Sequence, residues 1–154
     1  MTEIRLARFT DLDTTTLHDI IKLRIDVFVV EQACPYPELD GRDTEPETRH
    51  LWAERDGKVL GYLRILAEPD GAARIGRVCT AAHARGDGIA SRLLDHALAE
   101  IGDRPIRLDA QSYLVGFYQR YGFRVTGAEF VEDGIPHVPM ARDAASNGAA
   151  AEPR

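Results

Sequence analysis

The apolar residues of this chain alternate first at the period of a strand and then at the period of a helix. Alternation over Glu3–Phe9 places Ile4 and Leu6 on one face, which predicts a first strand. From Leu17 onward the apolar residues recur every three or four positions, and this spacing predicts a helix that continues to about Val30. The chain is therefore expected to begin with a strand followed by a helix.

The predicted helix has a start signal and is followed by a break in the pattern. Asp13 and the threonines at 14–16 carry side-chain oxygens that can accept hydrogen bonds from the first-turn amides. Residues 31–47 are rich in Pro, Gly and Asp and have no sustained apolar period, so they are predicted to form a long loop. Loops of that length inside a compact domain are usually functional or disordered.

Strand patterns return after the loop. Residues 51–66, with an Asp56-Gly57 turn, predict a hairpin, and Ala73–Thr80 predicts a further strand. A second helix is predicted to begin at Ile89, at or just after a glycine-rich loop, because apolar residues then follow at helical spacing to Ile101. The middle of the chain therefore runs from a meander of strands through a glycine loop into a helix.

The remaining pattern predicts four short elements. They are a strand at 106–110, a helix at 114–121, a strand at 123–131 and, after an Asp-Gly turn, a strand at 137–141. Antiparallel strands, one strand-helix-strand crossover and a terminal hairpin predict an α+β fold, an α/β sandwich with a mixed, mostly antiparallel sheet flanked by helices. Residues 1–142 are expected to form one domain, and the Ala-, Gly- and Ser-containing tail at 143–154 is expected to be disordered.

Composition narrows the class of protein. The 154 residues suit one domain, 44% are hydrophobic, and no apolar run approaches the length of a membrane span. No signal peptide is recognised, so Cys34 and Cys79 are expected to be free thiols in a reducing cytoplasm. The net charge is -6 without a basic tract, which argues against nucleic acid as the partner. A soluble cytoplasmic protein is expected, with a homodimer left open.

The loop before the second helix has the composition of an anion-binding site. It contains Arg85-Gly86-Asp87-Gly88-Ile89-Ala90, between a strand and a helix. The first amides of a helix have no intrahelical partner and the helix dipole adds a partial positive charge there, so backbone alone can hold a phosphate. Glycines suit such a loop because they bring no side chain between the ligand and the amides.

This hexapeptide resembles the Arg/Gln-x-x-Gly-x-Gly/Ala motif of the GNAT N-acetyltransferase superfamily. A second segment, residues 117–123, resembles the helix of that family in which a Tyr precedes a Gly-Phe pair, here Tyr118 before Gly122 and Phe123. Residues 29–36 and 132–137 resemble the ElaA-like branch. The resemblance extends over roughly residues 3–142 and implies the GNAT fold.

The resemblance implies a cosubstrate and an acceptor. The cosubstrate is acetyl-coenzyme A (acetyl-CoA), and the acceptor is a primary amine on a small molecule or peptide. Gln111 or Ser112 stands where many relatives carry an Asn that contacts the cofactor. No metal site is expected, because the cysteines and histidines are not spaced as ligands. The residues assigned to acetyl-CoA by the resemblance are Val78, Cys79, Thr80, Arg85, Gly86, Asp87, Gly88, Ile89, Ala90, Ser91, Gln111 and Tyr118.

Acyl transfer from a thioester to an amine needs a deprotonated amine, a donor for the developing oxyanion and an acid for the departing thiolate. Tyr118 is the candidate acid, because a phenol with pKa near ~10 is still protonated where a thiol with pKa near ~8.5 ionises. Taken without the resemblance, Tyr118 at helical spacing from Phe117 and Tyr121 is better explained as a core residue, and the match to the family motif reverses that preference.

Several residues are candidates for the base. Glu31 and His137 rank first because both lie in the ElaA-like segments, and His50 and Asp109 follow. Deprotonation through water, or capture of the neutral amine from solution, needs none of them. Cys34 is an alternative acyl carrier, although direct transfer is the habit of the family, and Cys79 in an apolar strand is most simply a core residue.

Two charge clusters bear on the ligands. Between Arg74 and Arg92 four arginines stand against Asp87 alone, where an anionic cofactor is expected. Residues 31–47 carry six acids against Arg42. This acidic loop is either a solvated surface or an acidic lip that favours cationic amine acceptors.

The two candidate functions are an N-acetyltransferase and a non-catalytic acyl-CoA-binding module that senses or scaffolds. Release of thiol from acetyl-CoA in the presence of amines distinguishes them.

Overall fold

A computed structural model describes residues 1–144, which fall into two compact units. The first comprises Met1–Leu66 and Ile75–Glu100, and the second comprises Ala67–Arg74 with the chain from Ile101 onward. One domain over residues 1–142 stays a prediction. Most of the tail predicted to be disordered, residues 145–154, lies outside the described residues.

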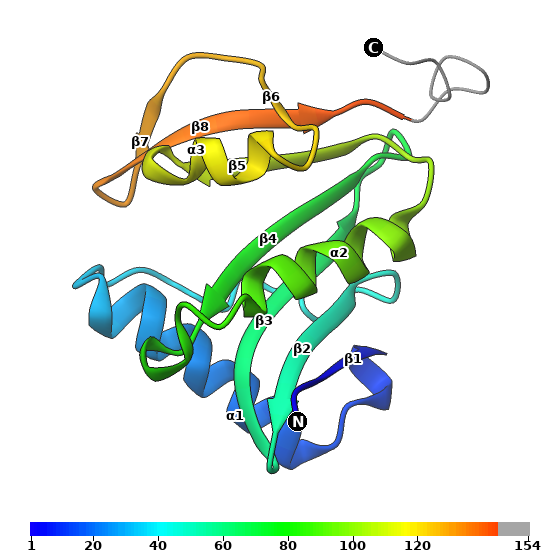
Figure 1. The fold of residues 1–154 in the computed structure, drawn as a ribbon, viewed down its shortest axis with the longest axis vertical. Coiled ribbons are helices and arrows are strands. Elements are labelled where there is room, and N and C mark those ends of the chain that lie inside the picture. The colour runs from blue at the N-terminus through cyan, green and yellow to red at the C-terminus, as the bar shows by residue number, and fades with distance from the viewer. Residues whose placement is uncertain (145–154) are drawn as a thin grey trace. The chain divides into compact units, whose positions relative to one another are not determined.

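The first unit contains the strand order β1-β2-β3-β4 (Figure 1). The first two residues of β4, Ala73 and Arg74, belong to the second unit, and the rest of the strand belongs to the first. β1 pairs antiparallel with β2, and β2 pairs antiparallel with β3 with Trp52 opposite Tyr62. The predicted first strand, hairpin, β4 and α2 are confirmed. The elements are β1 Glu3–Arg8, a 3-10 turn Phe9–Asp11, α1 Thr14–Ile25, a π-helix Asp26–Glu31, β2 Arg49–Arg55, β3 Lys58–Ala67, β4 Ala73–Thr80, a 3-10 turn Ala82–Ala84 and α2 Ile89–Ile101.

Helices α1 and α2 lie on opposite faces of this sheet. A Cβ built on Gly61 of β3 would meet Ile89 and Leu93 of α2, so α2 packs on the face where Gly61 points. The guanidinium of Arg24 in α1 lies over the ring of Tyr62, the next residue of β3, at 5.3 Å from its centroid. Because neighbouring residues of a strand point to opposite faces, α1 covers the other side. The middle of β3 is accordingly buried, which explains why it is apolar apart from Arg64.

The first helix begins as predicted and ends differently. The amide of Thr16 donates to the Asp13 carboxylate at 2.7 Å, so Asp13 is the N-cap. The predicted single helix to Val30 is wrong in its last turn, because α1 ends at Ile25 and a π-helix continues to Glu31. The wider turn changes the angle between successive side chains, and a 3.6-residue period cannot anticipate it.

The second unit contains the strand order β4-β5-β8-β6, with β7 also paired to β8. Ala73 and Arg74 of β4 pair parallel with β5, and the other pairings are antiparallel. The predicted helix at 114–121 is shorter than expected. The elements are β5 Ile106–Gln111, a 3-10 turn Ser112–Leu114, α3 Val115–Gln119, β6 Arg124–Val125, β7 Phe130–Glu132 and β8 Ile135–Arg142.

The predicted single strand at 123–131 is wrong. It is divided into β6 and β7, which pair with separate parts of β8. Between them the amide of Thr126 donates to the carbonyl of Pro139, and a Cβ on Gly127 would lie 2.9 Å from the Pro139 ring. Pro139 has no amide hydrogen for the ladder, so the chain leaves β8 there and returns at Phe130.

The predicted fold class is confirmed, since residues 1–144 form eight strands in mostly antiparallel pairings with three α-helices. Within this described part of the chain, no helix has the length and apolar character needed to cross a bilayer.

Candidate active site

The glycine loop ends at the N-terminus of α2. The amide of Arg92 donates to the carbonyl of Gly88 at 3.1 Å, so Gly88 is the N-cap and the amides of Ile89, Ala90 and Ser91 precede the first intrahelical bond. Gly86 and Gly88 have φ of 91° and 77°, and nothing lies within 4 Å of a Cβ built on either. The loop therefore offers amides without intrahelical partners beside open space, as an anion site requires.

The start of α2 is seated closely on the sheet. A Cβ on Gly61 would lie 2.6 Å from Cγ2 of Ile89, so the first turn approaches β3 at a distance that only glycine allows. At the other end of the loop, the amide of Ala81 donates to the carbonyl of Leu60 at 2.8 Å. Both flanks of the glycine loop are thus attached to β3.

Arg85, the first residue of the glycine motif, connects three segments. Its Nε donates to the carbonyl of Thr80 at 3.1 Å, and its two terminal nitrogens donate to the carboxylate of Glu31 at 2.5 and 2.7 Å. This hydrogen bonding lowers the pKa of Glu31, which makes its carboxylate a weaker base. Glu31, a predicted base, is therefore placed as the partner of Arg85 at the end of the π-helix.

The predicted acidic loop is only partly exposed, because two of its six carboxylates are buried. Glu38 and Asp43 are buried, with 4% and 8% of their surface exposed. Arg24 of α1 donates to Glu38 at 2.7 Å and to Asp43 at 2.9 Å. Arg64 of β3 donates to Asp43 at 3.1 Å and to Asp40 at 2.5 Å. Glu38 and Asp43 are therefore ion-paired inside the protein, whereas the side chains of Glu31, Glu45 and Glu47 are 44%, 42% and 67% exposed.

The arginines also set the ionisation of the loop. Burial alone would raise the pKa of Asp43, but hydrogen bonds and charge from Arg24 and then Arg64 outweigh it and lower the pKa. The hydrogen bond from Arg64 lowers the pKa of Asp40 well below its usual range. Both groups are therefore carboxylates at neutral pH. The sequence contained one indication of these buried ion pairs. Arg24 occupies a core position in the apolar stripe of α1, where a charged side chain needs a buried partner.

His50, the third candidate base, is part of the same buried region. Its Nδ1 lies 2.6 Å from the Tyr62 hydroxyl and its Nε2 lies 3.0 Å from the carbonyl of Asp43. Burial lowers its pKa, so the ring is neutral, and both nitrogens already have partners. These contacts assign His50 to the support of the loop.

The two cysteines are buried. Cys79 is 6% exposed, and burial raises the pKa of its thiol to about 12, so it remains protonated in the core of β4 between Val78 and Thr80. Cys34 is 8% exposed. This burial restricts the access that an acyl carrier requires.

The predicted local excess of positive charge is largely cancelled. Arg77 pairs with Glu38 and Arg85 pairs with Glu31. In the second unit Arg74 lies 3.5 Å from both Glu68 and Asp109. Asp109, a candidate base, is therefore the ion-pair partner of Arg74. Arg92 donates to the carbonyl of Thr2, and within residues 1–144 its guanidinium makes no ion pair.

Tyr118 lies in α3, in the second unit. It is 5% exposed, and its ring contacts Phe117 and Phe123 edge-on at centroid distances of 5.1 and 6.0 Å. Burial raises its pKa, so the phenol stays protonated, and no hydrogen bond involves its hydroxyl within the described residues. The Tyr118 carbonyl accepts from Phe123, and Gly122 has φ of 88°, so the Gly-Phe pair ends the helix that carries the tyrosine.

His137 and Gln111 are neighbours in the same unit, directly opposite each other in the pairing of β8 with β5. Nδ1 of His137 lies 2.8 Å from the carbonyl of Ile135, and the ring stacks on Phe130 with centroids 5.7 Å apart. A carbonyl only accepts, so Nδ1 carries the hydrogen and Nε2 of the neutral ring is left as a proton acceptor. Ser112, the alternative to Gln111, donates to Glu129 at 2.7 Å.

The predicted site residues therefore form two sets. The first unit brings together Glu31, Val78–Thr80 and Arg85–Ser91, while the second holds Gln111, Tyr118 and His137. Among the residues described, no group of three His, Cys, Asp or Glu side chains is arranged to hold a metal ion.

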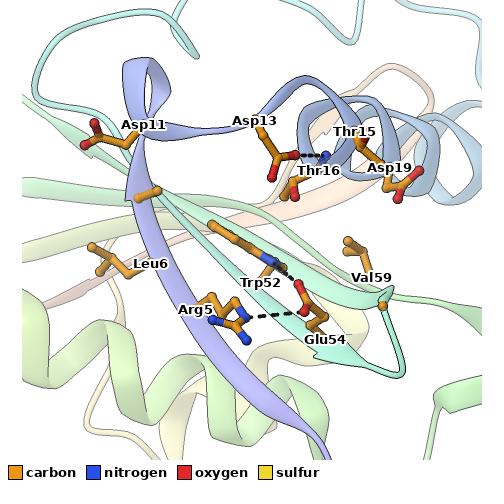
Figure 2. Close-up of a pocket in the computed structure, with 12 residues that line it drawn as sticks. Arg5, Leu6, Asp11, Asp13, Thr15, Thr16, Asp19, Trp52, Glu54 and Val59 are labelled. Atoms are coloured by element: carbon orange, nitrogen blue, oxygen red, sulfur yellow. Dashed lines mark hydrogen bonds and ion pairs between the residues drawn. The ribbon is translucent and has the colours of Figure 1, made fainter.

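A pocket of about 660 Å³ lies elsewhere in the first unit, between β1, the start of α1 and the β2–β3 hairpin (Figure 2). None of the predicted site residues lines it. The Trp52 indole donates to Glu54 at 3.2 Å, and Asp13 caps α1, so two of its acids serve the local structure. It is lined by Arg5, Leu6, Ala7, Asp11, Asp13, Thr15, Thr16, Asp19, Trp52, Glu54, Gly57 and Val59.

Comparison with known proteins assigns the class. The family model for the acetyltransferase (GNAT) domain matches residues 16–144. A UPF0039 protein of Mycobacterium tuberculosis is 56% identical over 147 residues, covering 92% of this chain and 94% of that protein. The crystal structure of Escherichia coli ElaA is similar with a TM-score of 0.88 and 35% identity, over 93% of this chain and 100% of that one. The crystal structure of an acyl-CoA N-acyltransferase from Pseudomonas aeruginosa is similar with a TM-score of 0.87 and 41% identity, over 92% of this chain and 99% of that one.

Fold and glycine loop thus define an acetyltransferase domain, a class whose chemistry is acyl transfer from an acyl-CoA. The chain belongs to the GNAT family and to its ElaA-like branch, which confirms the resemblance found in the sequence.

Proposed function

We propose that this protein transfers the acetyl group of acetyl-CoA to a primary amine by direct attack on the thioester. The observation that carries the proposal is the N-terminus of α2, where three amides without intrahelical partners follow two left-handed glycines with open space beside them. Family membership supports it, and so does the name of the Pseudomonas aeruginosa neighbour, which is an acyl-CoA N-acyltransferase.

The cosubstrate is expected along β4 and the glycine loop. The amides of Ile89, Ala90 and Ser91 bind the pyrophosphate, because the helix dipole and the unpaired donors both favour an anion there. Val78, Cys79 and Thr80 bind through their backbone, and Arg85, Gly86, Asp87 and Gly88 shape the loop. Gln111 supplies a polar contact from β5. Binding by these groups needs no metal ion.

The reaction requires one proton to leave the amine and one to reach the departing thiolate. The amine nitrogen attacks the carbonyl carbon, the C–S bond breaks, and the Tyr118 hydroxyl donates to the sulfur. The raised pKa of Tyr118 keeps this proton available across the physiological range, and the buried phenol has no competing hydrogen bond among the described residues.

His137 is the preferred base in this proposal. Its hydrogen bond to Ile135 leaves Nε2 as the acceptor for the proton of the amine, directly or through water. Glu31 is less suited to that role because Arg85 occupies both of its oxygens and lowers its pKa. Its expected role is to hold Arg85 in place.

The test is thiol release from acetyl-CoA with a panel of primary amines, measured for the parent, Tyr118→Phe and Tyr121→Phe. Tyr118→Phe removes one oxygen from a buried ring, so acetyl-CoA affinity and folding should hold while turnover falls on the order of 10²-fold. Tyr121→Phe makes the same chemical change one turn further along the chain and should stay within a few-fold of the parent.

Three outcomes are informative. Equal turnover in Tyr118→Phe and the parent would remove Tyr118 as the proton donor. Binding of acetyl-CoA without thiol release for any amine would favour the alternative, a sensor or scaffold module. No binding of acetyl-CoA by the parent would contradict both functions.

A further inference from the structure

Arg77 has an unusual backbone conformation inside a strand. Its φ is 56°, in the left-handed region, and it is the only residue other than glycine with positive φ inside a strand or helix of the described chain. The remaining three such residues, Ala33, Asp56 and Asp133, lie in turns. An L side chain disfavours this conformation, so surrounding contacts must maintain it.

Those contacts come from one segment, residues 32–48, here called the clamp loop. Arg77 Nε donates to the Glu38 carboxylate at 2.9 Å, and its terminal nitrogen donates to the Glu38 carbonyl, also at 2.9 Å. The guanidinium lies 3.6 Å from Asp40 and over the ring of Tyr36 at 5.7 Å from its centroid. The clamp loop therefore grips Arg77 on two sides.

Glu38 ties this grip to the core. The carboxylate oxygen that accepts from Arg77 also accepts from Arg24 of α1 at 2.7 Å, and the other oxygen accepts from the Tyr36 hydroxyl. Glu38 is 4% exposed and cannot exchange these partners for water without opening the loop. Movement of the clamp loop and movement of Arg77 are consequently coupled.

The position of Arg77 gives this coupling a functional consequence. It directly precedes Val78–Thr80, the strand residues assigned to acetyl-CoA, and a left-handed residue within a strand changes the direction of the backbone that follows. Thr80 is bound in turn by Arg85 through its carbonyl. The clamp loop thus acts on the same backbone that the cosubstrate is expected to contact.

We propose that Arg77 is a positioning residue that couples the clamp loop to the acetyl-CoA-binding backbone of β4. The inference rests on the proposed function. Bound acetyl-CoA holds Val78–Thr80 in one geometry, this geometry favours the gripped conformation of Arg77, and the clamp loop is thereby ordered. Acetyl-CoA binding is expected to stabilise the clamp loop, although the loop need not touch the ligand.

The test is hydrogen exchange of the clamp-loop amides with and without saturating acetyl-CoA, together with calorimetric affinity for acetyl-CoA. Arg77→Gly removes the guanidinium and accepts positive φ without strain, so it separates the grip from the backbone conformation. Arg77→Lys keeps the charge but lacks the forked donors. Arg74→Gln is the control, because Arg74 lies in the same strand and pairs with Glu68 and Asp109 outside the clamp loop.

In the parent and in Arg74→Gln, acetyl-CoA is expected to slow exchange in the clamp loop severalfold. In Arg77→Gly the free loop should exchange faster, acetyl-CoA should no longer slow it, and the dissociation constant should rise by about tenfold, or about 1.4 kcal/mol. In Arg77→Lys both the exchange rate of the clamp loop and the dissociation constant should lie between those of the parent and Arg77→Gly. If Arg77→Gly does not fold, Arg77→Lys is compared with the parent instead.

Acetyl-CoA binding by the parent with unchanged exchange in the clamp loop would overturn this inference and leave the proposed function standing. Arg77→Gly or Arg77→Lys variants in which acetyl-CoA still slows the loop as in the parent would also overturn it. A parent that does not bind acetyl-CoA would overturn the proposed function and this inference with it.

Discussion

Replacement of Gly61 by alanine tests how closely α2 is seated on the sheet. The added Cβ would lie 2.6 Å from Cγ2 of Ile89, 3.1 Å from Cδ1 of Leu93 and 3.3 Å from the carbonyl oxygen of Cys79. Carbon atoms in contact prefer about 3.5 to 4.0 Å, so Ile89 must move by about 1 Å. Leu93 can change rotamer, but the branched Ile89 side chain is stiff at χ1 and the Cys79 oxygen is backbone.

The overlap therefore has to be relieved by moving the first turn of α2. Overpacking of this kind costs typically about 1 to 3 kcal/mol of unfolding free energy. For a chain of this size each kcal/mol lowers Tm by about 2 to 4 °C. The same movement displaces the amides of Ile89, Ala90 and Ser91, so affinity for acetyl-CoA should fall as well.

Urea denaturation measures the stability of Gly61→Ala, and calorimetry measures its affinity for acetyl-CoA. Gly76→Ala is the matched control, because nothing lies within 4 Å of its added Cβ and its φ is outside the left-handed region. The control should be as stable as the parent within about 0.5 kcal/mol. If Gly61→Ala matched Gly76→Ala in both measurements, the close seating of α2 would be refuted.

Two further predictions follow from the loop and from the ion pairs. Gly88→Val places a β-branched residue at φ of 77°, so acetyl-CoA affinity should fall at least about tenfold in a folded protein, and unchanged affinity by calorimetry would contradict the anion site. The pKa of Asp40 is lowered in the folded state by Arg64, so its stabilising contribution is present above its unfolded pKa of about 3.9 and is lost as the pH falls below that value. The urea midpoint of the parent should accordingly decrease as the pH is lowered from about 5 to about 2. In Asp40→Asn the urea midpoint should decrease less over the same pH range. An equal decrease in the two proteins would mean that the pair with Arg64 does not form in solution.

Ion pairs, and not hydrophobic packing alone, hold the clamp loop in its conformation. Glu38, Asp40 and Asp43 are matched by Arg24, Arg64 and Arg77, so the cluster is balanced in charge. Buried pairs of this kind often contribute little net stability, but loss of one partner leaves an uncompensated buried charge. Conformational specificity of the loop is the role most consistent with this pattern.

Local sequence was sufficient for much of the fold. The boundaries of β4 and α2 are as predicted, because β4 ends at a turn and the helical stripe from Ile89 to Ile101 follows two glycines. The glycine motif and the Tyr-x-x-x-Gly-Phe spacing were recognisable because each is a helix terminus, one at the start of α2 and one at the end of α3. Signals of this type lie within a few residues of one another.

Partners far apart in the chain could not be found in this way. The acids of residues 31–47 form a charge run in the sequence, but Arg24, Arg64 and Arg77 come from α1, β3 and β4, and only folding brings them to Glu38 and Asp43. The division of the strand at 123–131 likewise depends on Pro139 in a different strand.

By itself the sequence determined the fold class, the family and the segment expected to bind the cosubstrate, because these depend on periodicity, turns and motifs that short stretches of chain contain. Only the tertiary structure decided which charged side chains are paired and buried. It showed Glu31 bound to Arg85, the clamp loop held by buried arginines and Arg77 turned into the left-handed region. The physical reason is that the pKa and exposure of a charged group depend on what lies within a few ångströms in space, and sequence distance does not report that.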